Sequence, residues 1–167
     1  MATEIERKFL VAGHGWRERV QSKSRIRQGY LSREGRASVR VRVIDGARAT
    51  LTIKAAKGGF SRHEFEYPIP IADGEALLEF CAGYLIDKVR HRVDVAGRIW
   101  EIDVFEGENT GLVIAEIELA HEQQQFEMPA WIGAEITGQE RYYNSRLARQ
   151  PFRGWVDQAG LDAGQAN

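Results

Sequence analysis

The stretch Glu4-Ile5-Glu6-Arg7-Lys8-Phe9 (residues 4–9) places Glu4, Glu6 and Lys8 at every second position near the start of the chain. Side chains on a β-strand alternate between its two faces. These three charged residues would therefore share one face, while Ile5 and Phe9 hold the other. The stretch predicts a strand with one charged and one apolar face, and the fold depends on what the charged face meets.

Length and composition indicate one globular domain. The chain has 167 residues, which is enough to bury a hydrophobic core. Its net charge of −1 gives no overall electrostatic attraction to nucleic acid or to an anionic membrane. The single cysteine, Cys81, excludes an intramolecular disulfide and an all-cysteine zinc site. We expect one domain over residues 1–150 and a partly disordered tail over 151–167. A cytoplasmic location is expected, because no signal peptide or membrane-spanning run is recognisable.

The rest of the chain contains a series of predicted strands. They lie at 3–11, 25–32, 37–44, 48–54, 62–69, 87–95, 98–105 and 112–120. Tight-turn sequences between neighbouring segments favour antiparallel pairing. A helix is predicted to begin at Asp73 as N-cap. The residues of this helix that should face the sheet are Ala76, Leu77, Phe80, Cys81 and Tyr84. A second helix is predicted within 139–149, with Leu147 and Ala148 inward.

Charged residues alternate with apolar ones on the later strands as well, and each of these strands carries one sign of charge. The basic strands contribute Arg40, Arg42, Lys54, Lys88, Arg90 and Arg92, and the acidic strands contribute Glu64, Glu66, Glu101, Asp103, Glu116 and Glu118. An open antiparallel sheet with a solvated polar face is the simpler alternative. However, like charges two positions apart on a strand repel, so an exposed face usually mixes signs. We therefore predict an α+β, mainly β fold: a closed eight-stranded antiparallel barrel, with helices outside and the charged faces lining its interior.

Such an interior suits one kind of ligand. Paired carboxylates are hard oxygen ligands for Mg²⁺ or Mn²⁺. Arginine and lysine side chains suit phosphate oxygens. Burying so many charges in a dry interior would be prohibitive, so the interior should hold water or an anion with its metal. The pattern predicts a metal–polyphosphate site.

The same residues resemble the motifs of the CYTH superfamily, the triphosphate tunnel metalloenzymes. Residues 4–9 are similar to its ExExK signature, and further blocks follow in family order up to about Ala148: Arg27-Gln28-Gly29-Tyr30-Leu31, Val39-Arg40-Val41-Arg42, Leu51-Thr52-Ile53-Lys54, Glu64-Phe65-Glu66, Lys88-Val89-Arg90, Trp100-Glu101-Ile102-Asp103-Val104-Phe105, Ala115-Glu116-Ile117-Glu118 and Arg141-Tyr142-Tyr143-Asn144. The resemblance implies an eight-stranded tunnel that binds triphosphate and acts on it with a divalent metal. The size of the chain makes it most similar to the small bacterial tripolyphosphatases.

Carried over residue by residue, the resemblance implies three groups of site residues. The metal ligands would be Glu4, Glu6, Glu116 and Glu118. The phosphate contacts would be Lys8, Arg40, Arg42, Lys54, Lys88 and Arg90. The catalytic set would be Glu4, Glu6, Lys8, Glu66 and Asp103, while Glu64, Glu66, Glu101 and Asp103 would organise a second metal or neighbouring cations. The implied chemistry is in-line attack of a metal-activated water on the terminal phosphorus, with Glu66 or Asp103 as the proton acceptor.

Other functions stay open at this point. Thiamine triphosphate or a nucleoside triphosphate could replace inorganic tripolyphosphate as the substrate, and a class IV-type adenylyl cyclase would use a ribose hydroxyl in place of water. A non-enzymatic polyphosphate or nucleotide sensor would keep the cations without needing the carboxylates. A single-strand nucleic-acid barrel would need exposed aromatic residues among its bases, whereas here valines occupy those positions. The expected partner is a small triphosphate, with no nucleic acid and no membrane, and a homodimer is compatible with the sequence.

Overall fold

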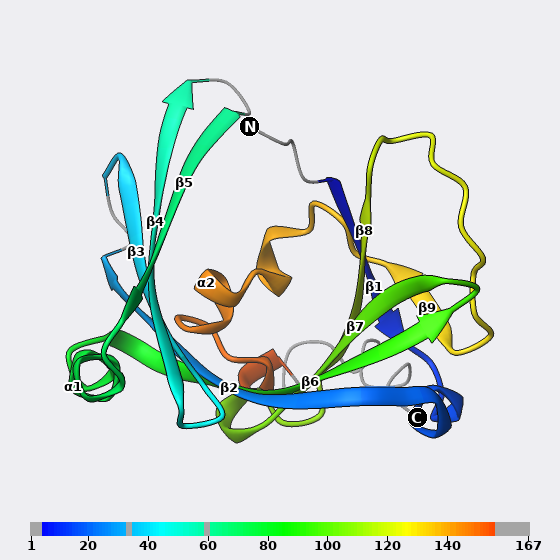
Figure 1. Ribbon diagram of the computed structural model, residues 1–167, viewed down its shortest axis with the longest axis horizontal. Coiled ribbons are helices and arrows are strands. Elements are labelled where there is room, and N and C mark those ends of the chain that lie inside the picture. The colour runs from blue at the N-terminus through cyan, green and yellow to red at the C-terminus, as the bar shows by residue number, and fades with distance from the viewer. Residues whose placement is uncertain (1–4, 33–34, 59–60, 156–167) are drawn as a thin grey trace.

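The computed structural model describes residues 5–32, 35–58 and 61–155, and it consists mainly of one nine-stranded antiparallel sheet (Figure 1). The strands are β1 (Ile5–Val11), β2 (Val20–Ser32), β3 (Ala37–Ile44), β4 (Arg48–Gly58), β5 (Ser61–Ile69), β6 (Ala82–Val95), β7 (Arg98–Phe105), β8 (Val113–Leu119) and β9 (Ile132–Glu135). The α-helices are α1 (Ile71–Glu79) and α2 (Asn144–Leu147), and short 3₁₀ turns are η1 (Gly15–Arg19), η2 (Gly107–Asn109), η3 (Glu140–Tyr142) and η4 (Phe152–Trp155). None of the described helices is long and apolar enough to cross a membrane.

The predicted mainly-β antiparallel fold is confirmed, with a correction to the number of strands. The order across the sheet is β5-β4-β3-β2-β6-β7-β8-β1-β9, so the described ladders end at β5 and β9. Figure 1 shows the sheet curving from one end to the other around α2. The ninth strand was not predicted, because its four residues include Gly133 and Ala134 and show no alternation. Gly133 lets β9 lie close to β1, since a Cβ there would come within 3.0 Å of the Leu10 carbonyl oxygen.

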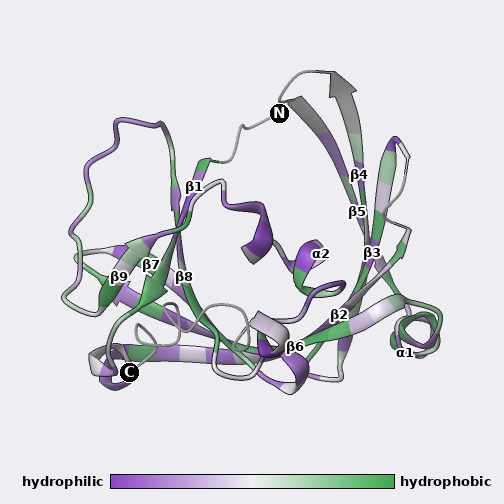
Figure 2. Cartoon of the chain, turned by 180° about the vertical axis from the view of Figure 1, so that it is seen from behind, coloured by the Kyte–Doolittle hydropathy of each residue, from purple (hydrophilic) through white to green (hydrophobic). Residues whose placement is uncertain are grey.

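The apolar faces of the strands pack outward, away from the curve of the sheet. Phe9, Trp100 and Ile117 belong to one buried cluster that Trp16 and Trp131 also join. On the other side of the molecule, β3 and β4 contribute their apolar residues to a second cluster with α1. Figure 2 shows the resulting alternation as bands of hydrophilic and hydrophobic residues along the strands. Because the apolar faces are buried in these outer clusters, the charged faces of the same strands turn inward.

Helix α1 differs from its prediction in both start and orientation. It follows Pro70 as N-cap, so Asp73 lies in its first turn and is not the cap. Its buried residues are Gly74 and Leu78, while Phe80, just past its last residue, is 75% exposed. Gly74 is needed there, because a Cβ would collide with the Ala49 Cβ on β4. The helical spacing was extended past Glu79 into the start of β6, and this shifted the predicted inward face.

The predicted second helix is confirmed in its position along the chain, although it is broken into η3 and α2, but the prediction that the helices lie outside the sheet is wrong for α2, which lies inside its curve. Leu147 and Ala148 are fully buried, and they pack inside the curve of the sheet with Ile86, Phe105 and other residues of a third cluster. Phe152 of η4 and Trp155 pack against the same cluster. Residues 156–167 of the predicted tail lie outside the described residues. The third cluster fills part of the interior, and α2 stands between it and the charged faces.

Candidate active site

The charged faces of the strands line one cavity of about 620 Å³. Its cationic residues are Lys8, Arg40, Arg42, Lys54, Lys88 and Arg90, and its acidic residues are Glu6, Glu64, Glu101, Glu116 and Glu118. Its uncharged residues are Tyr30, Ser38, Thr137, Gly138, Tyr143, Asn144 and Ser145. The prediction that the charged faces converge on a common interior is therefore confirmed, and the open solvated sheet is excluded.

Strand register sets the order of these charges. Glu101 on β7 lies opposite Glu116 on β8, and Glu116 in turn lies opposite Lys8 on β1. Glu6 lies opposite Glu118 in the same β1–β8 pair. A neighbouring cavity of about 490 Å³, lined also by Arg92 and Arg98, shares Glu101, Glu116 and Glu118 with the first. These three carboxylates therefore border both cavities.

Two of these carboxyl groups are in direct contact. Glu6 and Glu116 share a hydrogen bond, and Lys8 Nζ lies 3.0 Å from Glu6 and 3.8 Å from Glu116. Burial, then the hydrogen bond to Glu6 and its charge, raise the pKa of Glu116 to about 8. Burial opposes ionisation of Glu6 too, but the hydrogen bond from Glu116 and the charge of Lys8 bring its pKa down to about 2. The pair therefore holds one proton between two carboxyl groups near neutral pH.

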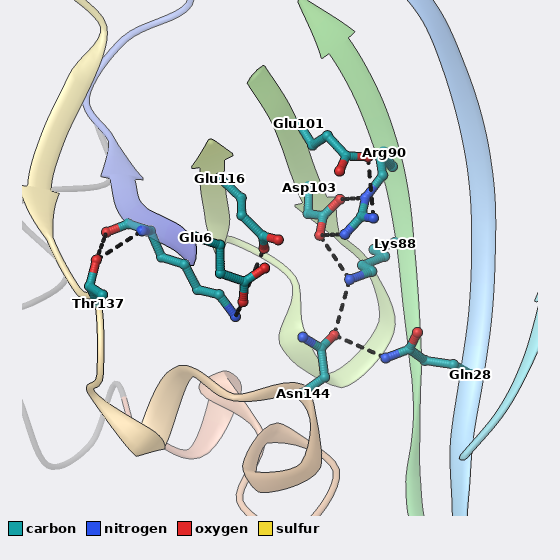
Figure 3. A network of polar contacts seen from close by, with 10 residues as sticks. Glu6, Gln28, Lys88, Arg90, Glu101, Asp103, Glu116, Thr137 and Asn144 are labelled. Atoms are coloured by element: carbon teal, nitrogen blue, oxygen red, sulfur yellow. Dashed lines mark hydrogen bonds and ion pairs between the residues drawn. The ribbon is translucent and has the colours of Figure 1, made fainter. Parts of the chain in front are cut away.

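A second group of charges is hydrogen-bonded around Asp103 (Figure 3). Lys88 Nζ donates to Asp103 Oδ2 at 2.8 Å, and Arg90 donates to both carboxylate oxygens at 2.8 and 2.9 Å. Burial lowers the pKa of Lys88 to about 8, although Asp103 acts in the opposite direction. For Arg90, the hydrogen bonds and charge of Asp103 outweigh burial and raise its pKa. One buried carboxylate thus fixes two cations toward the cavity.

The cations on β3 and β4 have looser partners. Arg40 Nη2 donates to Thr52 Oγ1 at 3.1 Å and lies 3.7 Å from Glu66. Lys54 Nζ lies 3.5 Å from Glu64. Burial, followed by repulsion from Arg40 and Arg90, lowers the pKa of Arg42 to about 10. These groups are held by single or long contacts, in contrast to the bonds around Asp103.

The structure brings together most of the predicted site residues, with three qualifications. Glu4 lies outside the described residues. Glu66 does not line the cavity but contacts Arg40 and Thr52 at its edge. Asp103 lies behind Lys88 and Arg90 and not on the cavity surface. Within the part of the chain that the structure describes, no group of three His, Cys, Asp or Glu side chains is close enough to form a ready-made metal site.

Among the site residues that were not predicted, two amides contact its cations. Gln28 is fully buried on β2 and accepts a hydrogen bond from Arg42 Nε at 2.7 Å. Asn144, the first residue of α2, accepts from Lys88 Nζ at 3.1 Å. Gln28 stands two positions before Tyr30 and so faces the same side as this cavity residue, and it also lies within the family-like block over residues 27–31. Nothing in the sequence around Asn144 indicates that it would meet Lys88.

Comparisons with known proteins agree with one another. The model of the CYTH domain family matches residues 2–149. An inorganic triphosphatase of Acetivibrio thermocellus is 43% identical over 158 residues, which cover 94% of this chain and 100% of that protein. One from Nitrosomonas europaea is 37% identical, covering 87% and 97% of the two chains. A crystal structure of the inorganic triphosphatase NE1496 superposes with a TM-score of 0.68 at 32% identity, covering 89% of this chain and 95% of that one.

Proposed function

The chain belongs to the CYTH domain family, and on that premise we propose that it is a divalent-metal-dependent hydrolase that removes the terminal phosphate of a triphosphate. The observation that carries the proposal is the cavity itself, in which six cationic and five acidic residues from seven strands face one another. A neutral or singly charged ligand could contact only a few of these charged groups. A polyanion together with a divalent metal satisfies both signs at once.

The cations are suited to hold the phosphates. Lys88 and Arg90 are fixed by Asp103 and present a rigid positive surface, while Arg40 and Lys54 approach from the opposite side. The buried Nε of Arg40 has no hydrogen-bond partner among the described residues, which fits a group that a substrate oxygen pairs. The side chains also stabilise the charge that spreads over the transferring phosphoryl group.

The carboxylates are suited to hold the metal. Glu6 and Glu116 lie so close that one of them keeps a proton near neutral pH, and such a pair favours a divalent cation in place of that proton. We assign Glu6, Glu116 and Glu118 to this site, together with Glu4. Bound Mg²⁺ or Mn²⁺ would acidify a coordinated water and offset phosphate charge.

The two carboxylates expected to accept the proton of the attacking water have contacts that favour positioning roles. Asp103 is saturated by Lys88 and Arg90, and Lys88 followed by Arg90 lowers its pKa despite burial. Glu66 accepts a hydrogen bond from Thr52 at 3.0 Å beside Arg40. We propose that both orient cations of the site.

Inorganic triphosphate is the substrate that we propose. The charged groups of the cavity suit phosphate and metal, and the two curated relatives at 43% and 37% identity are both named inorganic triphosphatases. We also propose a cytoplasmic setting, which the single cysteine supports because a reducing compartment needs no disulfides.

The test is a product assay with purified protein. Tripolyphosphate, thiamine triphosphate and ATP are incubated with Mg²⁺, Mn²⁺ or chelator, and orthophosphate, pyrophosphate and cyclic AMP are measured. We expect orthophosphate release from tripolyphosphate that chelator abolishes. Glu6→Gln should lower kcat by about a hundredfold or more, since it removes one charge from the metal site. Glu79→Gln, at the exposed end of α1, is the control and should retain full activity. Cyclic AMP as the main product, or unchanged turnover in Glu6→Gln, would contradict the proposal.

A further inference from the structure

Two neutral amides connect cations on β3 and β6, the two strands that pair with β2. Gln28 Oε1 accepts from Arg42 Nε at 2.7 Å, and Gln28 Nε2 donates to Asn144 Oδ1 at 3.2 Å. The same Asn144 oxygen accepts from Lys88 Nζ at 3.1 Å. Figure 3 shows Asn144 reaching from the end of its helix to both Lys88 and Gln28. Arg42 on β3 and Lys88 on β6 are thereby joined through one continuous hydrogen-bonded bridge.

The chemistry of this bridge differs from that of the other contacts in the cavity. Lys88 and Arg90 already share Asp103. The positive charge of Arg42 also lies close enough to Lys88 to lower its pKa, as does that of Arg90. A carboxylate in place of Gln28 or Asn144 would relieve this repulsion and stabilise the substrate-free protein. The chain instead places amides there, which accept hydrogen bonds without cancelling charge. The substrate-free protein is therefore less stable than it would be with a carboxylate at either position, but the cavity keeps its positive charge.

We infer that Gln28 and Asn144 are positioning residues that aim Arg42 and Lys88 at the substrate phosphates without adding a negative charge beside either cation. The inference deepens the proposed function and rests on it. Gln28 uses only Nε of Arg42, so this bond does not occupy the Nη nitrogens that can grip a phosphate. Asn144 stands at the start of α2, so the packing of Leu147 against the interior cluster sets where its side chain lies. The bridge thus transmits the position of α2 to both cations.

The sharpest test is Asn144→Asp, because we expect it to weaken tripolyphosphate binding without lowering the stability of the ligand-free protein. The aspartate keeps the shape and both acceptor contacts but adds a negative charge beside Lys88. Tripolyphosphate binding is measured by calorimetry in chelator at low salt, where no hydrolysis interferes. We expect the Kd to rise about tenfold, while the thermal midpoint of the ligand-free protein stays the same or increases. A residue with only a structural role would not lower affinity while preserving stability.

A second variant and a matched control complete the experiment. Gln28→Leu removes the acceptor of Arg42 without adding charge, and its KM should rise several-fold with a smaller change in kcat. Asn109→Asp is the control for Asn144→Asp: Asn109 is more deeply buried than Asn144, and its Oδ1 accepts from the Phe152 N–H at 2.9 Å, but it does not line the cavity. Its Kd for tripolyphosphate should stay within about twofold of the wild-type value.

The outcomes separate this inference from the proposed function. Wild-type protein that hydrolyses tripolyphosphate, with Asn144→Asp binding it as tightly, would overturn the inference alone. An equal loss of affinity in Asn109→Asp would do the same. If the wild-type protein binds tripolyphosphate but does not hydrolyse it, the proposed hydrolysis is wrong, and the binding comparison still decides the role of Asn144. If it does neither, both proposals fail together.

Discussion

The two sides of the cavity carry similar charges but hold them differently. On the wall formed by β6, β7, β8 and β1, the side chains of Lys88 and Asp103 are 1% and 7% exposed and lie 2.8 Å apart. On the wall formed by β3, β4 and β5, Lys54 and Glu64 are 40% and 48% exposed and lie 3.5 Å apart. In Figure 1 these walls face each other across α2. The pair on the first wall is held by the protein, whereas the pair on the second is open to water and ligand.

The difference follows from what backs each wall. The outer face of the β6–β7–β8–β1 wall is covered by a cluster that includes Trp16, Trp100 and Trp131. The β3–β4–β5 wall is backed by the smaller cluster with α1, and it ends at the terminal strand β5, whose Phe65 and Tyr67 are about half exposed on its outer side. A well-packed backing excludes water from the charges in front of it, so these must pair tightly. Rigid charges then provide pre-organisation, and mobile ones can adjust to the substrate.

The largest effect is predicted at Asp103. Asp103→Ala would leave Lys88 and Arg90 buried without their shared carboxylate, so the free energy of unfolding should fall by about 3–5 kcal/mol. Urea unfolding of the metal-free protein measures it. The counterpart on the other wall is Glu66→Ala, which removes a half-exposed partner of Arg40 and should cost less than about 1 kcal/mol. Equal losses in the two variants would contradict the proposed difference between the walls.

The next effect is a pH dependence that belongs to the β6–β7–β8–β1 wall alone. The pKa of Glu116 is raised from 4.5 to about 8, so the folded protein keeps a proton that the unfolded chain releases in this range. The free energy of unfolding of the metal-free protein should therefore fall as pH rises from about 5 to about 8, by on the order of 1–2 kcal/mol. Glu116→Gln keeps a neutral side chain that can bond Glu6, and it should flatten this slope.

Unfolding in urea with chelator, at several pH values across that range, measures the slope for both proteins. Glu64→Gln on the opposite wall is the matched control and should leave the slope of the wild type unchanged. A wild-type protein whose stability rises over the whole range would show that Glu116 is ionised in the folded state.

The contrast between the walls also explains what could be predicted from the sequence. Every charged cavity residue lies on a strand with period-two alternation, so the pattern alone assigned residues such as Arg42 and Glu116 to the inner face. The pattern is informative because it repeats over many strands. It could not tell that Asp103 would be buried behind two cations, since burial depends on how neighbouring strands curve.

Residues outside the alternation were beyond prediction for related reasons. Asn144 belongs to a four-residue helix, and its role depends on a contact with Lys88, which is 56 positions away. Of the predicted inward face of α1, Leu77 and Cys81 pack against the cluster with β3 and β4, whereas Phe80 fits the helical spacing but lies beyond the last helical residue and is exposed. Strand β9 is too short and too small in its side chains to give a signal. In each case tertiary packing, which the local sequence pattern does not encode, determined the position of the residue or element.

A smaller effect is predicted for Arg40, which represents the adaptable wall in substrate binding. Arg40→Ala removes one phosphate contact while its neighbour Arg42 keeps its bond to Gln28. KM for tripolyphosphate should rise about tenfold with a lesser change in kcat, because an adaptable contact contributes mainly to binding. Steady-state kinetics measures both constants. A kcat that falls a hundredfold with unchanged KM would mean that Arg40 acts in the transition state, and the distinction between the walls would not extend to catalysis.

The smallest effect is predicted for the contribution of the Lys54–Glu64 ion pair to the stability of the substrate-free protein. Lys54 and Glu64 are partly exposed, so their attraction is screened and offset by the entropy of two long side chains. A double-mutant cycle with Lys54→Met and Glu64→Gln should give a coupling energy of less than about 0.5 kcal/mol in thermal or urea unfolding. The coupling should weaken further in added salt. A salt-independent coupling of several times that size would require a dry, pre-formed pair, and this wall would then be as fixed as the one around Asp103.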